Sequence, residues 1–247
     1  MSLFARKTSE ASTHRVHIHF AQPMTERLRK NHEAGLIDTL LPACNSSGSI
    51  TNAKSTLDAA EEPISSDIEL EVTTSDPKKV FAKLLSSLTE SGLGRGSWLV
   101  IDDQRTDVGD SEYVLLRTRL ADESDAHLEP TVRALQHALG DGSIGWHEDV
   151  YYRHDGPVFV YNGNSAQAII HTLEAELVKH PLLSKAEIVP VSPSAVKGLD
   201  GTLYHQGAFR RRSALALQLG RLECLHRPAR GALRRPEEFS LRDLCLR

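Results

Sequence analysis

Cysteine is scarce in this sequence of 247 residues, and long apolar runs are missing. The three cysteines, Cys44, Cys224 and Cys245, include no C-x-x-C pair, so we expect neither a disulfide framework nor a thiolate zinc site. No run of about 18 apolar residues occurs, and the N-terminus lacks the apolar segment of a signal peptide. The sequence therefore predicts a cytoplasmic protein without a membrane span.

The last 43 residues, His205–Arg247, contain no lysine, valine, isoleucine or threonine but have ten arginines. Their four acidic residues leave this segment at +6, so the rest of the chain carries −10 of the total of −4. Leucine and arginine alternate there with neither a helical nor a strand period. Such a segment is typical of an appended basic tail or of a terminus read out of its original frame, and we favour the second interpretation. We expect residues 193–247 to lie outside the core.

The acidic charge of the remaining chain bears on its partners. Nonspecific binding to duplex nucleic acid depends on clustered lysine and arginine facing phosphates, and stacking on RNA normally accompanies a basic strand signature that is absent here. We therefore expect no nucleic-acid partner. An acidic surface suits a basic protein partner better.

We expect three segments in the N-terminal part of the chain. Residues 1–13 are polar, and we expect them to be disordered. Residues 14–42 contain an alternating strand pattern followed by apolar residues at helical spacing, which predicts a strand and a helix. Residues 43–66 are rich in serine, asparagine, threonine and acids, which favours a flexible connector.

Residues 67–192 predict an α+β core domain. The apolar pattern alternates in its strands and follows a 3.6-residue period in its helices. Asp76 and Pro77 are suited to begin the first helix, as cap and first-turn residue. The expected elements are a strand at 67–72, a helix from 76, strands at 98–101 and 113–120, a helix at 125–139, strands at 143–152 and 158–161, a helix from 164, and a strand at 186–191.

The order of these elements indicates the fold class. Residues 67–152 read β-α-β-β-α-β, which is the split βαβ arrangement of ferredoxin-like domains. We expect the C-terminal βαβ to extend this sheet, with the helices on one face. An incomplete second copy is the alternative for the flanking elements. Fold class alone does not assign a function.

The densest polar cluster is W-H-E-D-V-Y-Y-R-H-D at 146–155, with His147, Glu148, Asp149 and His154 as candidate functional residues. On a regular strand, His147 and Asp149 would share one face. A histidine and a carboxylate two positions apart can be metal ligands, or a base with its orienting acid. The alternative, which we favour, is a polar strand side that faces solvent.

A second candidate is the H-x-H pair His17 and His19, whose imidazoles can converge on one ion from one strand face. If this pair met His147 and Asp149, four ligands would be available for a divalent metal. The protein would then be a metal-dependent hydrolase or lyase, with Glu148 or His154 transferring protons. We favour no metal and no other cofactor, because nothing in the sequence brings the two pairs together.

The glycines at 92, 94 and 96 resemble a phosphate-binding loop, but they follow an expected helix and precede a strand. Dinucleotide and P-loop sites require the opposite order. No complete catalytic motif is present, so we favour a non-enzymatic binding or interaction protein. One form would be an inhibitor or immunity-type protein whose acidic residues contact a basic partner. The candidate acidic residues are Glu69, Glu71, Asp102, Asp103, Asp107 and Asp110.

Overall fold

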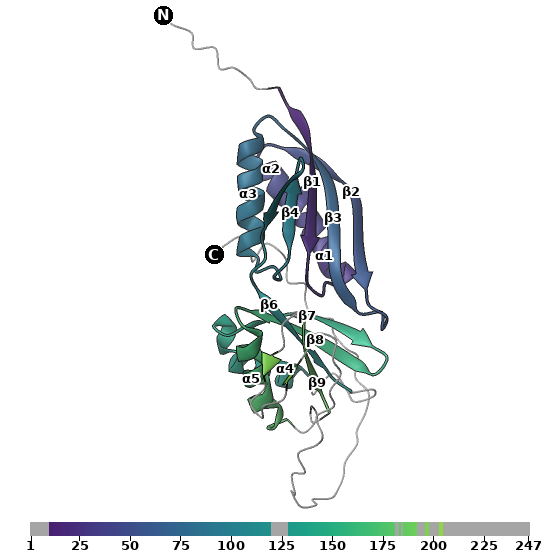
Figure 1. Ribbon diagram of the computed structural model, residues 1–247, viewed down its shortest axis with the longest axis vertical. Coiled ribbons are helices and arrows are strands. Elements are labelled where there is room, and N and C mark those ends of the chain that lie inside the picture. The colour runs from purple at the N-terminus through teal and green to yellow at the C-terminus, as the bar shows by residue number, and fades with distance from the viewer. Residues whose placement is uncertain are drawn as a thin grey trace, which may run out of the picture.

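The structure, a computed structural model, describes residues 10–119, 128–180, 183, 185–191, 196–197 and 203–204. It contains two antiparallel sheets, each with its own helices, and the two resulting units lie one above the other in Figure 1. We call residues 12–107 the N-terminal unit and residues 112–190 the C-terminal unit.

The N-terminal unit is a five-stranded sheet with the strand order β2-β3-β1-β4-β5. Neighbouring strands in this sheet are antiparallel. The first six main elements follow the order βαββαβ, which is the ferredoxin-like arrangement. The elements are β1 (Ser12–Phe20), α1 (Glu26–Ala34), a π-helical turn (Gly35–Leu40), α2 (Leu41–Ala43), β2 (Ser47–Leu57), β3 (Pro63–Thr74), α3 (Pro77–Glu90), β4 (Trp98–Ile101) and β5 (Gln104–Asp107).

Alternation along β1 decides which face of this sheet is buried. Val16, Ile18 and Phe20 are at most 2% exposed and join the core, whereas His17 and His19 point to the opposite face. Helix α3 covers the core side, with Val80, Leu84 and Leu88 buried. It begins as the sequence predicts, because the Asp76 side chain accepts a hydrogen bond from the Lys79 amide and Pro77 occupies the first turn.

The C-terminal unit repeats the same topology. Its sheet has the order β7-β8-β6-β9, again with antiparallel neighbours. Helices α4 and α5 supply Leu135, Ile170 and Leu173 to a core on one face of this sheet. The elements are β6 (Glu112–Arg117), α4 (Leu128–Ala138), a 3-10 turn (Gly140–Gly142), β7 (Trp146–Arg153), β8 (Gly156–Gly163), α5 (Ala166–Leu177) and β9 (Glu187–Pro190).

The α+β, ferredoxin-like fold class is therefore confirmed, but the units divide the chain differently from the expectation. The expected β-α-β-β-α-β unit at 67–152 combines the second half of one unit with the first half of the next. The C-terminal βαβ completes a second sheet and does not extend the first. Both halves contain the same types of element in the same order, so an order counted from β3 also reads as ferredoxin-like.

The expectation of a flexible connector at 43–66 is wrong, because most of this segment forms β2 and the start of β3. Strand β2 is an edge strand with both faces largely exposed, so its residues are polar and carry no hydrophobic alternation. Disorder was expected through residue 13, but β1 already begins at Ser12. Residues 1–9 lie outside the described part of the chain.

Part of the expected C-terminal tail also has regular structure. β10 (Val196–Lys197) pairs with β11 (Leu203–Tyr204), and these strands contact α5 and β9 respectively. The C-terminal unit is thus extended beyond residue 192. Residues 205–247, which contain the arginine-rich segment, lie outside the described residues.

Candidate functional site

The face of the second sheet that is turned away from α4 and α5 is buried, and we call it the buried face. Its apolar residues are between 0% and 4% exposed. Three loops of the N-terminal unit contact polar residues of this face: the loop after β1, the β2–β3 turn and the loop after α3. The junction of the two units therefore lies here. The apolar residues are Tyr113, Leu115, Val158, Val160 and Val189.

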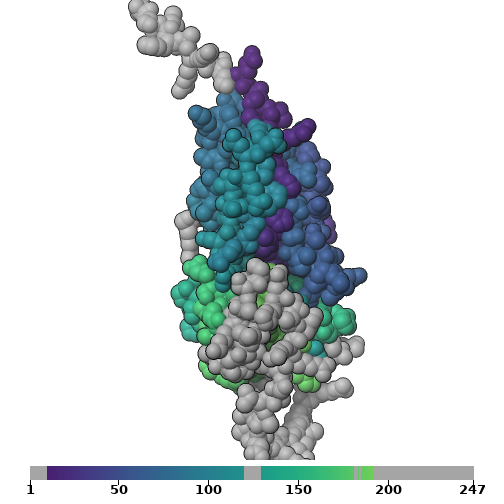
Figure 2. All heavy atoms as spheres, in the orientation of Figure 1, coloured from purple at the N-terminus to yellow at the C-terminus, as the bar shows by residue number. Residues whose placement is uncertain are grey.

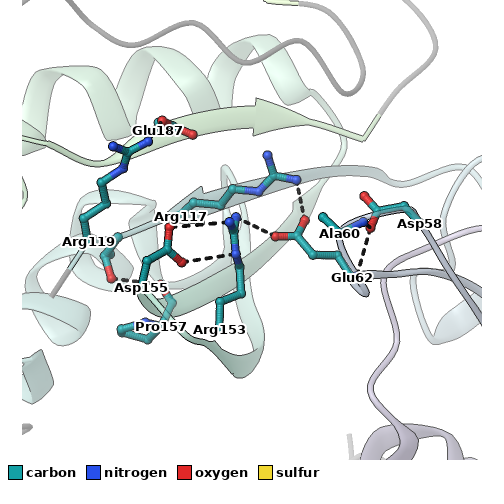
Figure 3. Close-up of polar contacts among 10 residues, drawn as sticks. Asp58, Ala60, Glu62, Arg117, Arg119, Arg153, Asp155, Pro157 and Glu187 are labelled. Carbon is teal, nitrogen blue, oxygen red and sulfur yellow. Dashed lines mark hydrogen bonds and ion pairs between the residues drawn. The ribbon is translucent and has the colours of Figure 1, made fainter. Parts of the chain in front are cut away.

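Buried charges bind the β2–β3 turn to the C-terminal unit (Figure 3). Glu62, at 2% exposure, pairs with Arg117 from β6 and with Arg153 from β7, whose Nη1 lies 2.8 Å from Oε1. Arg153 also contacts Asp155 in the β7–β8 turn. Asp58 shapes the turn by accepting the Glu62 amide hydrogen bond at 2.9 Å. These buried pairs join the β2–β3 turn to β6 and β7, and loss of the Glu62 carboxylate would be costly because both arginines are largely buried.

Asp149 is the second anchor of the junction. It is 2% exposed, and its carboxylate accepts hydrogen bonds from Thr25 Oγ1 at 2.6 Å and from Arg27 Nη2 at 2.5 Å. Thr25 is also the N-cap of α1, where its Oγ1 accepts the Leu28 amide hydrogen bond. Asp149 thus holds the start of α1 against β7. Its carboxylate is occupied by structural contacts within the chain.

Glu148 lies beside Asp149 in a different environment. Its Oε2 accepts a hydrogen bond of 2.6 Å from Asn162 Nδ2, and Asn162 also donates to the Tyr113 hydroxyl at 3.3 Å. Tyr113 in turn donates to the Gly92 carbonyl at 3.2 Å. Burial, with a smaller contribution from the charge of Asp149, raises the pKa of Glu148 to about 7, although the hydrogen bonds from Tyr113 and Asn162 act to lower it.

A register shift in β7 separates the histidine from the carboxylate that the sequence placed with it. The shift lies between His147 and Asp149, so these residues do not share a face, which corrects the expectation of regular alternation. His147 packs beside the rings of Phe159 and Tyr161 on the helix side, and burial lowers its pKa. His154 is exposed in the β7–β8 turn and joins neither group.

His17 and His19 lie on the outer face of the other sheet. Both rings contact the same oxygen of Asp67, at 3.0 and 2.9 Å, and both lie against Trp98. Burial acts to raise the pKa of Asp67, but the hydrogen bonds from His19 and His17 hold it below its ordinary value. The four residues of the alternative metal site therefore belong to separate groups. Among the described residues, no group of three or more His, Cys, Asp or Glu is arranged to hold a metal ion.

The outer face around Trp98 is polar, and we call it the polar face. In Figure 2, β1 and the β4–β5 hairpin reach the surface side by side in the upper unit. Strand register places the residues of β1, β3, β4 and β5 together. The Arg105 guanidinium lies 5.0 Å from the centroid of the Trp98 ring. The polar face comprises Arg15, His17, His19, Asp67, Glu69, Glu71, Trp98, Val100, Arg105 and Asp107.

Three of the six acidic candidates belong to strands whose side chains form the polar face. Glu69 and Glu71 come from β3 and Asp107 comes from β5. Asp102 and Asp103 form the β4–β5 turn with positive φ angles of 44° and 71°, and Asp102 contacts His14 on β1. Asp110 lies elsewhere, with its amide bonded to Leu93.

Sequence reasoning missed the residues that join distant parts of the chain. Glu62 lay in the expected connector, and Arg117 was assigned only to a strand. Asp67 and Trp98 gave no local signal, because their contacts to the histidines arise from pairing β1 with β3 and β4. The continuous apolar run from Tyr113 to Leu116 was the one available sign that both faces of β6 are buried.

Comparisons with known proteins yield structural likenesses only. No family model and no curated protein matches the chain. The regulatory subunit of aspartate kinase from Thermus thermophilus is 11% identical, with a TM-score of 0.24, over 68% of this chain and 98% of that one. The acetolactate synthase small subunit from Thermotoga maritima is 16% identical, with a TM-score of 0.21, over 72% and 92%.

An unknown protein from Galdieria sulphuraria is 10% identical, with a TM-score of 0.24, over 73% of this chain and 98% of that one. The two named neighbours are ACT-domain proteins, which consist of ferredoxin-like βαββαβ units. The fold class rests on the strand order of the two sheets. None of the described helices is long and apolar enough to cross a membrane.

Proposed function

We propose that the chain is a non-enzymatic binding protein that contacts a basic protein partner through the polar face and the adjoining β4–β5 turn. The observation that carries this proposal is the contrast between the two sheets. The buried face is occupied by the junction, whereas the polar face presents charged side chains to solvent. A cytoplasmic location accompanies this proposal.

The charges and the aromatic ring of the polar face support such a role. Glu69 and Glu71 stand two positions apart on β3, and Asp102 and Asp103 form the neighbouring turn. Acidic residues gathered on one surface raise the encounter rate with a basic partner. Trp98 is held by stacking on His19 and supplies a fixed apolar anchor at the centre of these charges.

The internal contacts of the candidate polar cluster also favour binding over catalysis. Asp149 holds Thr25 and Arg27, and His147 lies among aromatic rings. A general base must reach the proton that it removes. These two side chains instead stabilise the junction and the core.

The test is affinity capture from a native lysate with the intact chain as bait. The double variant Glu69→Lys/Glu71→Lys reverses charge on the polar face. A matched control, Glu90→Lys/Glu129→Lys, reverses two exposed charges on helices α3 and α4. Partners are identified by mass spectrometry, and the affinity of a purified basic partner is then measured at low and high salt.

We expect a basic protein that binds the wild type and the control but binds the double variant about tenfold or more weakly, with an affinity that decreases as salt increases. Equal binding by the wild type and the double variant would overturn the proposal. Partners without a basic surface would overturn it as well.

A further inference from the structure

Ser12, His14 and Asp102 are joined by hydrogen bonds at the N-terminal end of β1. The Ser12 hydroxyl lies 2.8 Å from His14 Nε2, and His14 Nδ1 contacts Oδ2 of Asp102 in the β4–β5 turn. Ser12 and His14 continue the series of core-side positions of β1 that includes Val16. The side chains of the polar face, such as Arg15, point to the other side of this strand.

The carboxylate of Asp102 fixes the tautomer of His14. The hydrogen bond from His14 holds the pKa of Asp102 below its ordinary value, so the carboxylate is ionised. Its Oδ1 accepts the Arg15 amide hydrogen bond at 3.1 Å, which leaves Oδ2 to face His14. An ionised carboxylate can only accept a hydrogen bond. His14 Nδ1 therefore carries the proton, and Nε2 presents its lone pair to the Ser12 hydroxyl.

Packing holds the imidazole of His14 and leaves the serine accessible. The His14 ring stands edge-on to Phe81 of α3, with the ring centroids 5.1 Å apart and an interplanar angle of 86°. The His14 side chain is 17% exposed, and Ser12 is exposed. A reagent from solvent can thus reach the Ser12 hydroxyl while the base beside it stays in place.

The backbone next to Ser12 offers a hydrogen-bond donor. Strand alternation directs the Thr13 amide to the same side as the Arg15 amide, toward β4. Within the described strands, β4 pairs with β1 only from Val16 onward, so the Thr13 amide has no β4 partner. This amide can donate to negative charge that develops on a group attacked by Ser12.

We propose that Ser12 is an activated nucleophile that accepts an acyl group from an activated ester or thioester, with His14 as its general base and Asp102 as the residue that positions His14. The Ser12 Oγ attacks the acyl carbonyl carbon while its proton passes to His14 Nε2. The bond from this carbon to the leaving oxygen or sulfur then breaks, and His14 returns the proton to the leaving group. The products are an O-acyl serine and a free alcohol or thiol.

The surroundings of Ser12 favour an activated acyl donor. The Thr13 amide is a single backbone donor, and an exposed site stabilises an oxyanion less than a water-excluded one does. An ester or thioester with a good leaving group needs little such help, whereas an amide needs much more. The reaction is one acyl transfer per chain and requires no turnover, so it adds to the binding role proposed for the polar face.

Acetylation by p-nitrophenyl acetate tests this proposal in the intact chain. After brief exposure and proteolysis, mass spectrometry compares the acetylation of Ser12 with that of Ser49, an exposed serine on β2. In the wild type, Ser12 should react about a hundredfold faster than Ser49. His14→Gln should lower the rate at Ser12 to that at Ser49. The control Ser49→Ala should leave the rate at Ser12 unchanged.

Asp102→Asn tests the positioning role. Because the Arg15 amide retains the side-chain oxygen, the new NH2 group should face His14 Nδ1 and move the imidazole proton to Nε2. Acetylation of Ser12 should then fall about tenfold or more. Nitrogen NMR of the His14 ring should show the change from the Nδ1–H to the Nε2–H tautomer, which loss of a merely structural contact would not produce.

Equal acetylation of Ser12 and Ser49 in the wild type would overturn the proposal, and so would fast acetylation of Ser12 in His14→Gln. An Nε2–H tautomer of His14 in the wild type would also overturn it, in a measurement that does not depend on the folding of a variant. These variants retain Glu69 and Glu71, so failure of this proposal is distinguishable from failure of binding at the polar face.

Discussion

The two units share one strand order but use the outer faces of their sheets in opposite ways. In the N-terminal unit this face carries the exposed residues Arg15, Glu71 and Arg105, whereas in the C-terminal unit it carries Leu115 and Val160 and is buried. The helix-side cores of both units are similarly apolar. The parity of apolar residues along the strands therefore determines which sheet docks and which remains free.

The comparison also shows why a fold class does not assign a function. The same βαββαβ scaffold provides a docking platform in one unit and a charged surface in the other. The difference lies in a few alternate strand positions, which leave the strand order unchanged.

Equivalent substitutions on the two outer faces should have the largest and most unequal effects. Val160→Asp places a charge without a partner on the buried face and should lower the free energy of unfolding by about 4 kcal/mol or more. Val100→Asp makes the same change on the polar face and should cost about 1 kcal/mol or less. Urea unfolding of both variants measures the difference. Similar losses at the two sites would contradict the contrast between the faces.

Loss of a buried ion pair at the junction should cost more stability than loss of an exposed ion pair on the polar face. Glu62→Ala removes the buried carboxylate that pairs with Arg117 and Arg153 at the junction and should destabilise the protein by about 3–5 kcal/mol. Asp107→Ala removes an exposed pair with Arg105 and should change stability by about 0–1 kcal/mol. Thermal or denaturant unfolding measures both, and a small effect of Glu62→Ala would show that the charges do not fix the docking.

Helix-side core substitutions should affect both units alike. Leu84→Ala in α3, and Leu135→Ala and Ile170→Ala in α4 and α5, each truncate a fully buried aliphatic side chain. Each should cost about 2–5 kcal/mol. Losses below about 0.5 kcal/mol at all three sites in denaturant unfolding would argue against the helix-on-sheet cores.

The free energy of unfolding of the N-terminal unit should depend on pH through His32, with a smaller effect than the substitutions of buried residues above. Burial lowers the pKa of His32 on α1 from 6.5 to about 4. The unfolded chain then binds the proton first, so the N-terminal unit should lose about 2–3 kcal/mol as pH falls from 6.5 to 4. Unfolding as a function of pH should show the loss in the wild type and a flatter profile in His32→Gln, whereas an unchanged profile would exclude His32 as the source.

Much of the fold could be predicted from the sequence, because periodicity and caps are local signals. The stripe containing Leu84 and the cap at Asp76 correctly indicated α3. The edge strand β2 could not be recognised, since an exposed strand needs no apolar alternation. The boundary between the units was missed for the same reason, because an unrecognised β2 shifts the apparent start of the ferredoxin-like order.

The candidate site was less predictable because its contacts are long-range. The cluster at 146–155 did contain the junction residues Glu148 and Asp149, and β3 did contain the acidic pair Glu69 and Glu71. A strand pattern assumes regular alternation, so the register shift after His147 was not foreseen. Glu62 depends on the docking of two units, which no local spacing encodes.

Hydroxyl-radical footprinting of the intact chain tests most directly whether one outer face is open and the other is covered. Trp98 should react readily in the polar face, as should the exposed internal standards Trp146 and Tyr152. Tyr113, at 2% exposure on the buried face, should react far more slowly. Fast modification of Tyr113 together with protection of Trp98 would contradict the account.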